Sequence, residues 1–191
     1  PDLNLILEHV YDPHNISAVL RSCDSVGVRE LFVLYTDPGL KEERLELGKR
    51  SSAGARKWVD VHFYTQAAPC FERVRRTYAR ILSTHLEETA VSLYELELTT
   101  PVALLFGNER DGVSQEALAH ADGNFRIPQV GMSASLNISV ACAVTLYEAF
   151  RQRWNKGFYT DQLPMDARQR EAQLQDYLRR NDRASIRRMD P

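Results

Sequence analysis

Three short polar segments of this sequence carry the residues best suited to chemistry, and each lies beside an apolar run. The first, HNISAVLRSCDSVG, places Asn15 six residues before Arg21, nearly two turns of an α-helix. At this spacing Arg21 could share a helix face with the residues just after Asn15. Asn15 can equally be a helix cap and Arg21 a solvated helix residue. The spacing alone therefore leaves both interpretations open.

The second segment, LLFGNERDGVS, covers residues 104–114. An apolar strand that ends at Gly107 would place Asn108, Glu109 and Arg110 at the carboxyl end of a sheet, where open α/β folds bind ligands. The alternative is an ordinary strand-to-helix loop with Ser114 as its N-cap. The text GNERDG matches neither a GxGxxG fingerprint nor a Walker loop, so it does not predict a bound nucleotide.

The third segment, IPQVGMSASLNISVACAV, covers residues 127–144. A proline and a glycine bracket a tight loop, and Ser133 or Ser135 is expected to cap the helix that follows, with apolar helical spacing from Ile138 to Phe150. Capping by a serine leaves Asn137 unexplained, because a helix disfavours asparagine unless its amide has a partner. The segment therefore predicts a polar contact for Asn137.

Other chemistries fit the sequence poorly. The text GMSAS is one residue short of the GxSxG elbow of serine hydrolases, and none of the five histidines follows the candidate serine. The three cysteines are far apart and form no CxxC pair, so neither a disulfide framework nor a zinc site is expected. The histidine spacing suggests no other metal site. A reducing cytosol is the expected location.

Composition predicts one globular domain with short appendages, since 43% of the 191 residues are hydrophobic and 26% are charged. The formal net charge of -2 gives no basic field over the whole molecule, so binding of nucleic acid would need local patches. No uninterrupted apolar run reaches the length of about 20 residues that spans a bilayer.

Strand and helix patterns alternate along the chain. Strands are expected at 3–10, 30–36, 58–64, 80–86 and 100–109, helices at 15–27, 66–79 and 138–150, and a connector at 91–98. This order predicts an α/β fold with a mostly parallel sheet and helices on both faces. After Gly157 the sequence becomes a charged helix with a thin apolar stripe. We therefore expect one domain at 1–157 and a helical carboxyl-terminal extension at 158–191.

Taken together, HNISAVLRSCDSVGV, LFGNERDGVS and IPQVGMSASLNISVACAVTLYEAFRQR resemble the SPOUT superfamily of RNA methyltransferases. The likeness is greatest to its TrmH branch, the tRNA guanosine 2'-O-methyltransferases, and it extends over roughly residues 3–160. The resemblance implies a deep trefoil knot in the carboxyl-terminal part of the sheet, S-adenosylmethionine as cofactor and a guanosine of the tRNA D-loop as substrate. It also implies a cytoplasmic homodimer whose active site is completed across the interface, with no metal and no membrane.

The resemblance also implies roles for individual residues. The catalytic positions would be Arg21, Asn15, Glu109, Ser135 and Asn137. The cofactor-contacting positions would be Thr84, Gly107, Asn108, Ile127, Gly131, Met132 and Leu136, mostly through the main chain. Arg21 would activate the ribose hydroxyl; because a guanidinium is normally charged, clamping a phosphate and stabilising the alkoxide is an equally reasonable role.

Contact with RNA is expected from basic residues in three places: Lys49, Arg50, Arg56 and Lys57 in the central loop, Arg73, Arg75, Arg76 and Arg80 around a helix, and Arg151, Arg153 and Lys156 near the end of the domain. Arg151 and Arg153 rank first, because FRQR matches a family segment associated with tRNA, whereas the helix set is as readily a solvated face. Two alternatives remain open: methylation of ribosomal RNA, and a non-catalytic RNA-binding paralogue.

Overall fold

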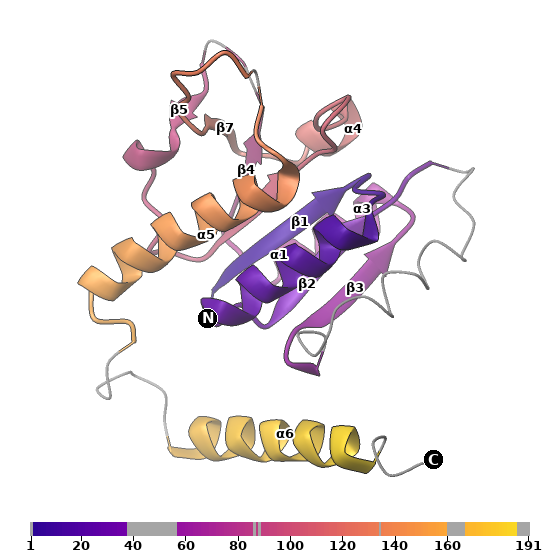
Figure 1. The fold of residues 1–191 in the computed structure, drawn as a ribbon, viewed down its shortest axis with the longest axis vertical. Coiled ribbons are helices and arrows are strands. Elements are labelled where there is room, and N and C mark those ends of the chain that lie inside the picture. The colour runs from indigo at the N-terminus through magenta and orange to yellow at the C-terminus, as the bar shows by residue number, and fades with distance from the viewer. Residues whose placement is uncertain are drawn as a thin grey trace.

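The apolar segments of the chain pair into one parallel sheet in a computed structural model that describes residues 2–37, 57–85, 87, 89–133, 135–159 and 167–186 (Figure 1). The strand order is β3-β2-β1-β6-β4-β7-β5, and every described strand pair is parallel. The strands are β1 (Leu3–Glu8), β2 (Glu30–Leu34), β3 (Asp60–Tyr64), β4 (Arg80–Thr84), β5 (Val91–Ser92), β6 (Val102–Phe106) and β7 (Gly123–Arg126).

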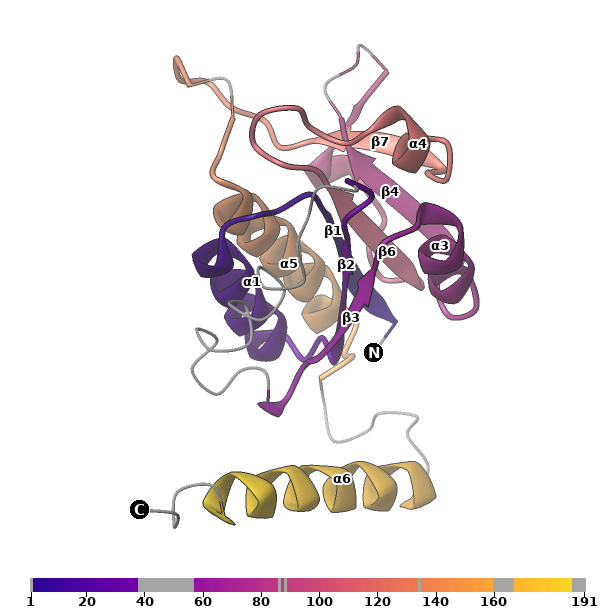
Figure 2. The same ribbon diagram turned by 90° about the vertical axis from the view of Figure 1, so that its right-hand side faces the viewer.

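Helices cover both faces of this sheet (Figure 2). Helices α1 (Pro13–Ser25) and α5 (Ile138–Asn155) lie on one face, and α3 (Ala67–Arg75) and α4 (Gln115–Leu118) lie on the other. Each face has its own apolar layer, and successive residues of β1 alternate between them: Leu5 and Leu7 belong to the first and Ile6 to the second. The predicted α/β architecture with a parallel sheet and two helical layers is confirmed.

The start of α1 differs from the prediction that Asn15 caps it. Asp12 is the N-cap, its carboxylate accepts a hydrogen bond from the His14 amide at 2.8 Å, and Pro13 occupies the first helical turn. Proline suits that position because its missing N–H would have no partner there. The Asn15 side chain is therefore free of capping. Gly27, with φ of +80°, follows the helix and permits the left-handed turn that ends it.

Two short strands escaped sequence analysis. The predicted connector at 91–98 contains β5 and a 3₁₀ turn at Leu93–Glu95, and β7 was not anticipated. The sequence of β7, GNFR, has only one buried residue, Phe125, so it carries no apolar alternation to detect. Both strands nevertheless matter for the site, because they extend the sheet beyond β4.

Helix α6 (Ala167–Ile186) lies at the opposite end of the molecule from the segment that follows β7 in both views (Figures 1 and 2). Arg180 binds both carboxylate oxygens of Asp60 at 3.0 and 2.8 Å, and the Tyr177 ring packs edge-on against Trp58. The domain boundary at residue 157 stays a prediction. None of the described helices has the length and apolar character needed to cross a bilayer.

Asp122 connects α3, β4 and β7 and gives a test of the sheet extension. Its carboxylate accepts hydrogen bonds from Arg75 at 2.7 and 2.8 Å and from the Ile81 amide at 2.7 Å. The Arg75 bond is the largest of the causes that lower the pKa of Asp122, followed among the favourable ones by the Ile81 bond. The folded-state pKa thus lies below the ordinary value of 3.8.

We expect Asp122→Asn to lower the free energy of unfolding at pH 7 by about 1 kcal/mol, since the Arg75 pair is partly exposed to solvent. The stabilisation is complete above the ordinary pKa and is lost as the pH falls through the folded-state pKa, so wild type and variant should converge in acid. Urea unfolding at several pH values measures this. Asp111→Asn is the control, because Asp111 is exposed and no described residue donates a hydrogen bond to its carboxylate. A pH-independent difference would contradict the linkage.

Candidate active site at the carboxyl edge of the sheet

A cavity of about 350 Å³ opens beyond the carboxyl ends of β4, β6 and β7. Its apolar wall is formed by Phe106, Phe125, Ile127, Leu136 and Ile138. The remaining lining is contributed by Thr84, His85, Gly107, Asn108, Glu109, Arg110, Asp111, Gly112, Arg126, Gln129, Ser135 and Ala141. This volume falls within the range of small-molecule sites, and an apolar wall with a few polar groups is their usual composition.

The loop after β6 is held in a tight turn. The Asn108 side-chain oxygen accepts the amides of Arg110 and Asp111 at 2.8 and 2.7 Å, and Gly112 donates its amide back to the Asn108 carbonyl. Gly107 has no room for a side chain, since a Cβ there would lie 2.0 Å from the Gly112 carbonyl carbon. The turn thus needs glycine at 107 for close backbone approach and at 112 for a φ of +70°.

Glu8 anchors the far end of this loop. It is buried at the end of β1, and its carboxylate accepts hydrogen bonds from the Ser114 amide at 2.8 Å and the Ser114 hydroxyl at 2.5 Å. Ser114 in turn caps α4 by accepting the Ala117 amide, as predicted. Sequence analysis missed Glu8. A carboxylate that closes an apolar strand was the available signal, since a buried carboxylate must find donors.

A polar bridge joins three elements at the rim of the cavity. Asn15, in the first turns of α1, donates to the Glu109 carboxylate at 2.8 Å and accepts from the Asn137 amide at 3.1 Å. Asn137 also accepts the Ser139 amide at 2.9 Å and is itself the N-cap of α5. The predicted serine caps are therefore wrong, while the predicted polar partner of Asn137 is Asn15.

Arg21 does not take part in this bridge. It is exposed, and no other described residue forms a hydrogen bond or ion pair with its side chain. Six residues of helix place it about 120° from Asn15 around the axis of α1. It shares a face instead with Ser25, one turn later, whose hydroxyl contacts the Tyr147 hydroxyl of α5 at 3.4 Å.

The predicted cofactor positions divide into two groups. Thr84, Gly107, Asn108, Ile127 and Leu136 all line the cavity, and so does Ser135 of the predicted catalytic set. Gly131 and Met132 lie outside it: Met132 is fully exposed, and no atom lies within 4 Å of the position that a Cβ on Gly131 would take.

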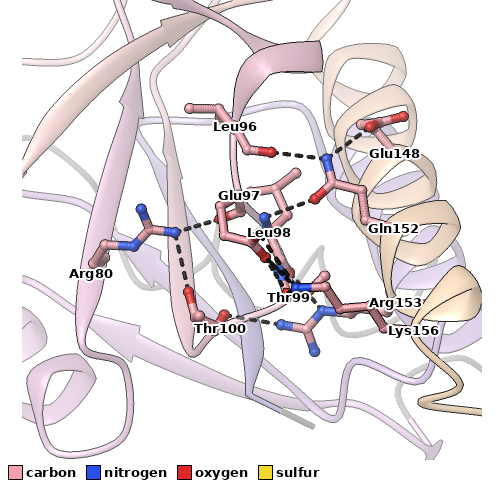
Figure 3. A network of polar contacts seen from close by, with 10 residues as sticks. All are labelled: Arg80, Leu96, Glu97, Leu98, Thr99, Thr100, Glu148, Gln152, Arg153 and Lys156. Atoms are coloured by element: carbon pink, nitrogen blue, oxygen red, sulfur yellow. Dashed lines mark hydrogen bonds and ion pairs between the residues drawn. The ribbon is translucent and has the colours of Figure 1, made fainter.

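The predicted RNA contact at Arg153 does not agree with the structure (Figure 3). Its side chain is 1% exposed, and its guanidinium donates to the Leu98 carbonyl at 2.8 Å, the Asp2 carboxylate at 2.7 Å and the Thr100 carbonyl at 3.2 Å. These bonds join α5 to the segment before β6, and burial keeps the guanidinium out of reach of a phosphate. Arg151 is exposed but forms a two-pronged ion pair with Glu148.

Most of the other predicted RNA contacts are also paired. Arg75 binds Asp122, Arg80 binds the Glu97 carbonyl and Thr100, and Lys156 binds Thr99 and Glu97. Arg73 lies 3.7 Å from Glu30, and Lys57 lies over the Trp58 ring. Lys49, Arg50 and Arg56 fall outside the described residues.

Nucleophilic and metal chemistry find little support in the described part of the chain. Burial raises the pKa of the Cys142 thiol well above its ordinary value, with smaller effects from the nearby Cys23 and Glu109. Burial likewise raises the pKa of Cys23, so both thiols stay neutral. The described residues contain no cluster of three or more histidine, cysteine, aspartate or glutamate side chains that could hold a metal ion.

Comparisons with known proteins agree on one family. Residues 2–147 match the model of the SpoU rRNA Methylase family. The chain is 41% identical over 180 residues to a Thermus thermophilus tRNA (guanosine(18)-2'-O)-methyltransferase, covering 94% of this chain and 90% of that one.

Solved structures give the same result. The crystal structure of an A. aeolicus TrmH/SpoU tRNA modifying enzyme matches with a TM-score of 0.76 and 31% identity, over 93% of this chain and 88% of that one. The SpoU methyltransferase AviRb from Streptomyces viridochromogenes, in complex with the cofactor AdoMet, matches with a TM-score of 0.69 and 26% identity, over 79% and 57% of the two chains.

Gly107→Ala tests the packed turn. Because its Cβ would meet the backbone of Gly112 and Val113, we expect the turn to shift and the protein to lose about 3 kcal/mol, or about 6 to 12 °C in Tm for a chain of this size. Amide hydrogen exchange of residues 108–113 reports the turn itself. Gly123→Ala is the matched control, since its Cβ would only touch the Leu82 side chain at 3.7 Å. Unchanged Tm and exchange in Gly107→Ala would refute the close approach.

Proposed function

The chain belongs to the SpoU rRNA Methylase family, and from this premise we propose that it methylates the ribose 2'-hydroxyl of a guanosine in the D-loop of tRNA. It is an RNA ribose methyltransferase, and its cofactor is S-adenosylmethionine, which supplies the methyl group as an electrophilic carbon. The observation that carries the proposal is the bridge of Asn15, Glu109 and Asn137 at the rim of a cofactor-sized cavity.

The cavity fits that cofactor in volume and in chemistry. Its apolar wall suits an adenine ring, and Gly107 lines the cavity beside that wall. The described residues 128–133, 135 and 136 make no described backbone-to-backbone hydrogen bond, so their peptide groups remain available to a ligand. We assign Thr84, Gly107, Asn108, Ile127 and Leu136 to the cofactor, and keep Gly131 and Met132 only as rim positions.

The choice of tRNA as the substrate rests on how much of the chain matches a tRNA methyltransferase. The likeness to the Thermus tRNA enzyme spans 94% of the chain, reaching past the residue-147 limit of the family model. This favours tRNA over ribosomal RNA as the substrate. The presence of all five catalytic-type residues, Asn15, Arg21, Glu109, Ser135 and Asn137, favours an active enzyme over a non-catalytic RNA-binding paralogue.

Arg21 would act on the reacting hydroxyl. Methyl transfer needs that oxygen to lose its proton while it lies in line with the methyl carbon. A charged guanidinium is a poor proton acceptor but a good donor to a developing alkoxide and to the neighbouring phosphate. Asn15, Glu109 and Asn137 would fix the rim of the site, and Ser135 would hold the ribose.

We further propose a homodimer, because one chain leaves Arg21 without a described partner and turned away from the bridge. The face of α1 that carries Arg21 continues into an exposed apolar stripe on α5, formed by Val140, Tyr147 and Trp154 at seven-residue intervals. Exposed large apolar side chains in such a stripe are typical of an interface. A second copy packed there would bring Arg21 against the cavity of its partner.

The path of the chain after β7 supports the proposed trefoil knot. Strand β7 lies on the far side of β4 from β6 and β1. The chain then comes back across the sheet to α1, where the Asn137 side chain donates a hydrogen bond to Asn15 and α5 packs against α1. We propose that this return threads through the loop that follows β6, and that the enzyme acts in the cytoplasm on its tRNA.

Removing the guanidinium tests its role. We expect Arg21→Ala to lower kcat about 100- to 1,000-fold, as for the loss of a donor to a developing oxyanion, with cofactor affinity unchanged. Transfer of label from S-adenosylmethionine to a tRNA transcript, followed by mapping of the labelled nucleotide, measures the rate. Calorimetry measures cofactor binding. Arg168→Ala on α6 is the control. Near-normal transfer by Arg21→Ala, or label on a base, would remove the proposed mechanism.

A mixed dimer tests the shared active site. Arg21→Ala keeps its cavity, while Leu136→Arg should block the cavity but keep Arg21. If Arg21 serves the partner's cavity, half of the co-expressed dimers carry one complete site, and about a quarter of wild-type activity should return. Each variant alone should be inactive. Recovery would not occur if Arg21 served the cavity of its own chain, or if the protein stayed monomeric.

A further inference from the structure

The arginines that the structure describes fall into two classes. Those remote from the cavity are mostly neutralised: Arg29 and Arg180 bind Asp176, Arg75 binds Asp122, and Arg151 binds Glu148. Such pairs satisfy the donors of the guanidinium and reduce its attraction for an anion. The overall charge of -2 makes the unpaired ones more informative, because the whole molecule does not attract RNA.

Two unpaired guanidinium groups lie at the cavity itself. Arg110 and Arg126 are both exposed, both line the cavity, and neither forms a described hydrogen bond or ion pair through its side chain. They come from different elements, Arg110 from the turn after β6 and Arg126 from the last residue of β7.

Rigid backbone supports both positions. The Arg110 amide is bound by the Asn108 side chain at 2.8 Å, within the turn fixed by Gly107 and Gly112. Arg126 is held in the sheet by pairing with Ser92 of β5. Two arginines on fixed backbones, with free forks, are well suited to phosphate oxygens.

We propose that Arg110 and Arg126 bind backbone phosphates of the substrate RNA at the mouth of the cavity, next to the ribose that is methylated. This inference rests on the proposed function and adds to it an RNA-binding site distinct from the sequence-predicted basic residues. Phosphate contacts of this kind set the register of the nucleic acid and carry no base specificity. Arg110 and Arg126 would therefore position the target ribose.

The cofactor also carries an anionic group, its carboxylate, and could be the alternative occupant. The exposure of both side chains favours RNA, because a cofactor inside the cavity would cover the groups that hold it. RNA phosphates, in contrast, approach from the solvent side. The number of charges points the same way, since one carboxylate does not need two arginines on separate elements.

The test compares the double variant Arg110→Ala/Arg126→Ala with wild type in tRNA binding at several salt concentrations. Losing two phosphate contacts should reduce the slope of log affinity against log salt by about 1.4 to 1.8. It should also raise the KM for tRNA about 10-fold or more. Calorimetry with S-adenosylmethionine should give an unchanged Kd. Arg110→Lys/Arg126→Lys, which keeps both charges, should restore most of the slope.

Arg76→Ala is the matched control, because Arg76 is exposed and has no described side-chain partner but lies after α3, remote from the cavity. It should change affinity less than twofold. A salt slope in the double alanine variant equal to that of Arg76→Ala would overturn the inference. So would a raised Kd for S-adenosylmethionine with tRNA affinity unchanged, which would assign both arginines to the cofactor. The tRNA-binding measurements test the phosphate contacts of Arg110 and Arg126 independently of catalysis. Failure of the wild-type protein to methylate tRNA would instead refute the proposed function.

Discussion

The hydrogen bonds of Asn15 are the constraint on which the rest of the site depends. One amide donates to Glu109 and accepts from Asn137, and so joins helix α1, the turn after β6 and the start of α5. Asn15 is 94 residues from Glu109 and 122 residues from Asn137 in sequence, and the strand order brings them to one edge of the sheet. Because Asn137 also caps α5, a substitution in the bridge would also disturb the packing of α1 against α5.

Sequence patterns predicted the layers of the fold well. Long apolar runs such as VALLF of β6 are buried on both faces, and that composition identifies a central parallel strand. Elements with little apolar content were missed, and β7 is the clearest example. The predicted helix caps were wrong for a related reason. Asp12 and Asn15 can each cap α1, and Ser135 and Asn137 can each cap α5. The hydrogen bond between Asn15 and Asn137, a tertiary contact, decides between them.

The site was predicted in composition but not in geometry. Spacing along α1 left open whether Asn15 and Arg21 act together, and the helix turns them to different faces. A sequence motif also does not show whether a side chain is buried, and Arg153 was predicted to contact RNA although it is buried. In FRQR, one arginine is exposed and paired with Glu148, while the other is buried and donates to the carbonyls of Leu98, Asp2 and Thr100 and to the Asp2 carboxylate. Arg153 therefore serves the fold, and the same text cannot distinguish the two roles.

The buried ionic side chains of Glu8 and Arg153 have similar surroundings and similar structural roles. Each lies where an apolar element meets a loop, and each is surrounded by partners that replace its hydration. Glu8 fixes the turn after β6 from one end, while Arg153 fixes the segment before β6. The strand that leads into the cavity is thus held by polar contacts at both ends. Arginines at the cavity mouth need no such partners, because solvent hydrates them until an anion arrives.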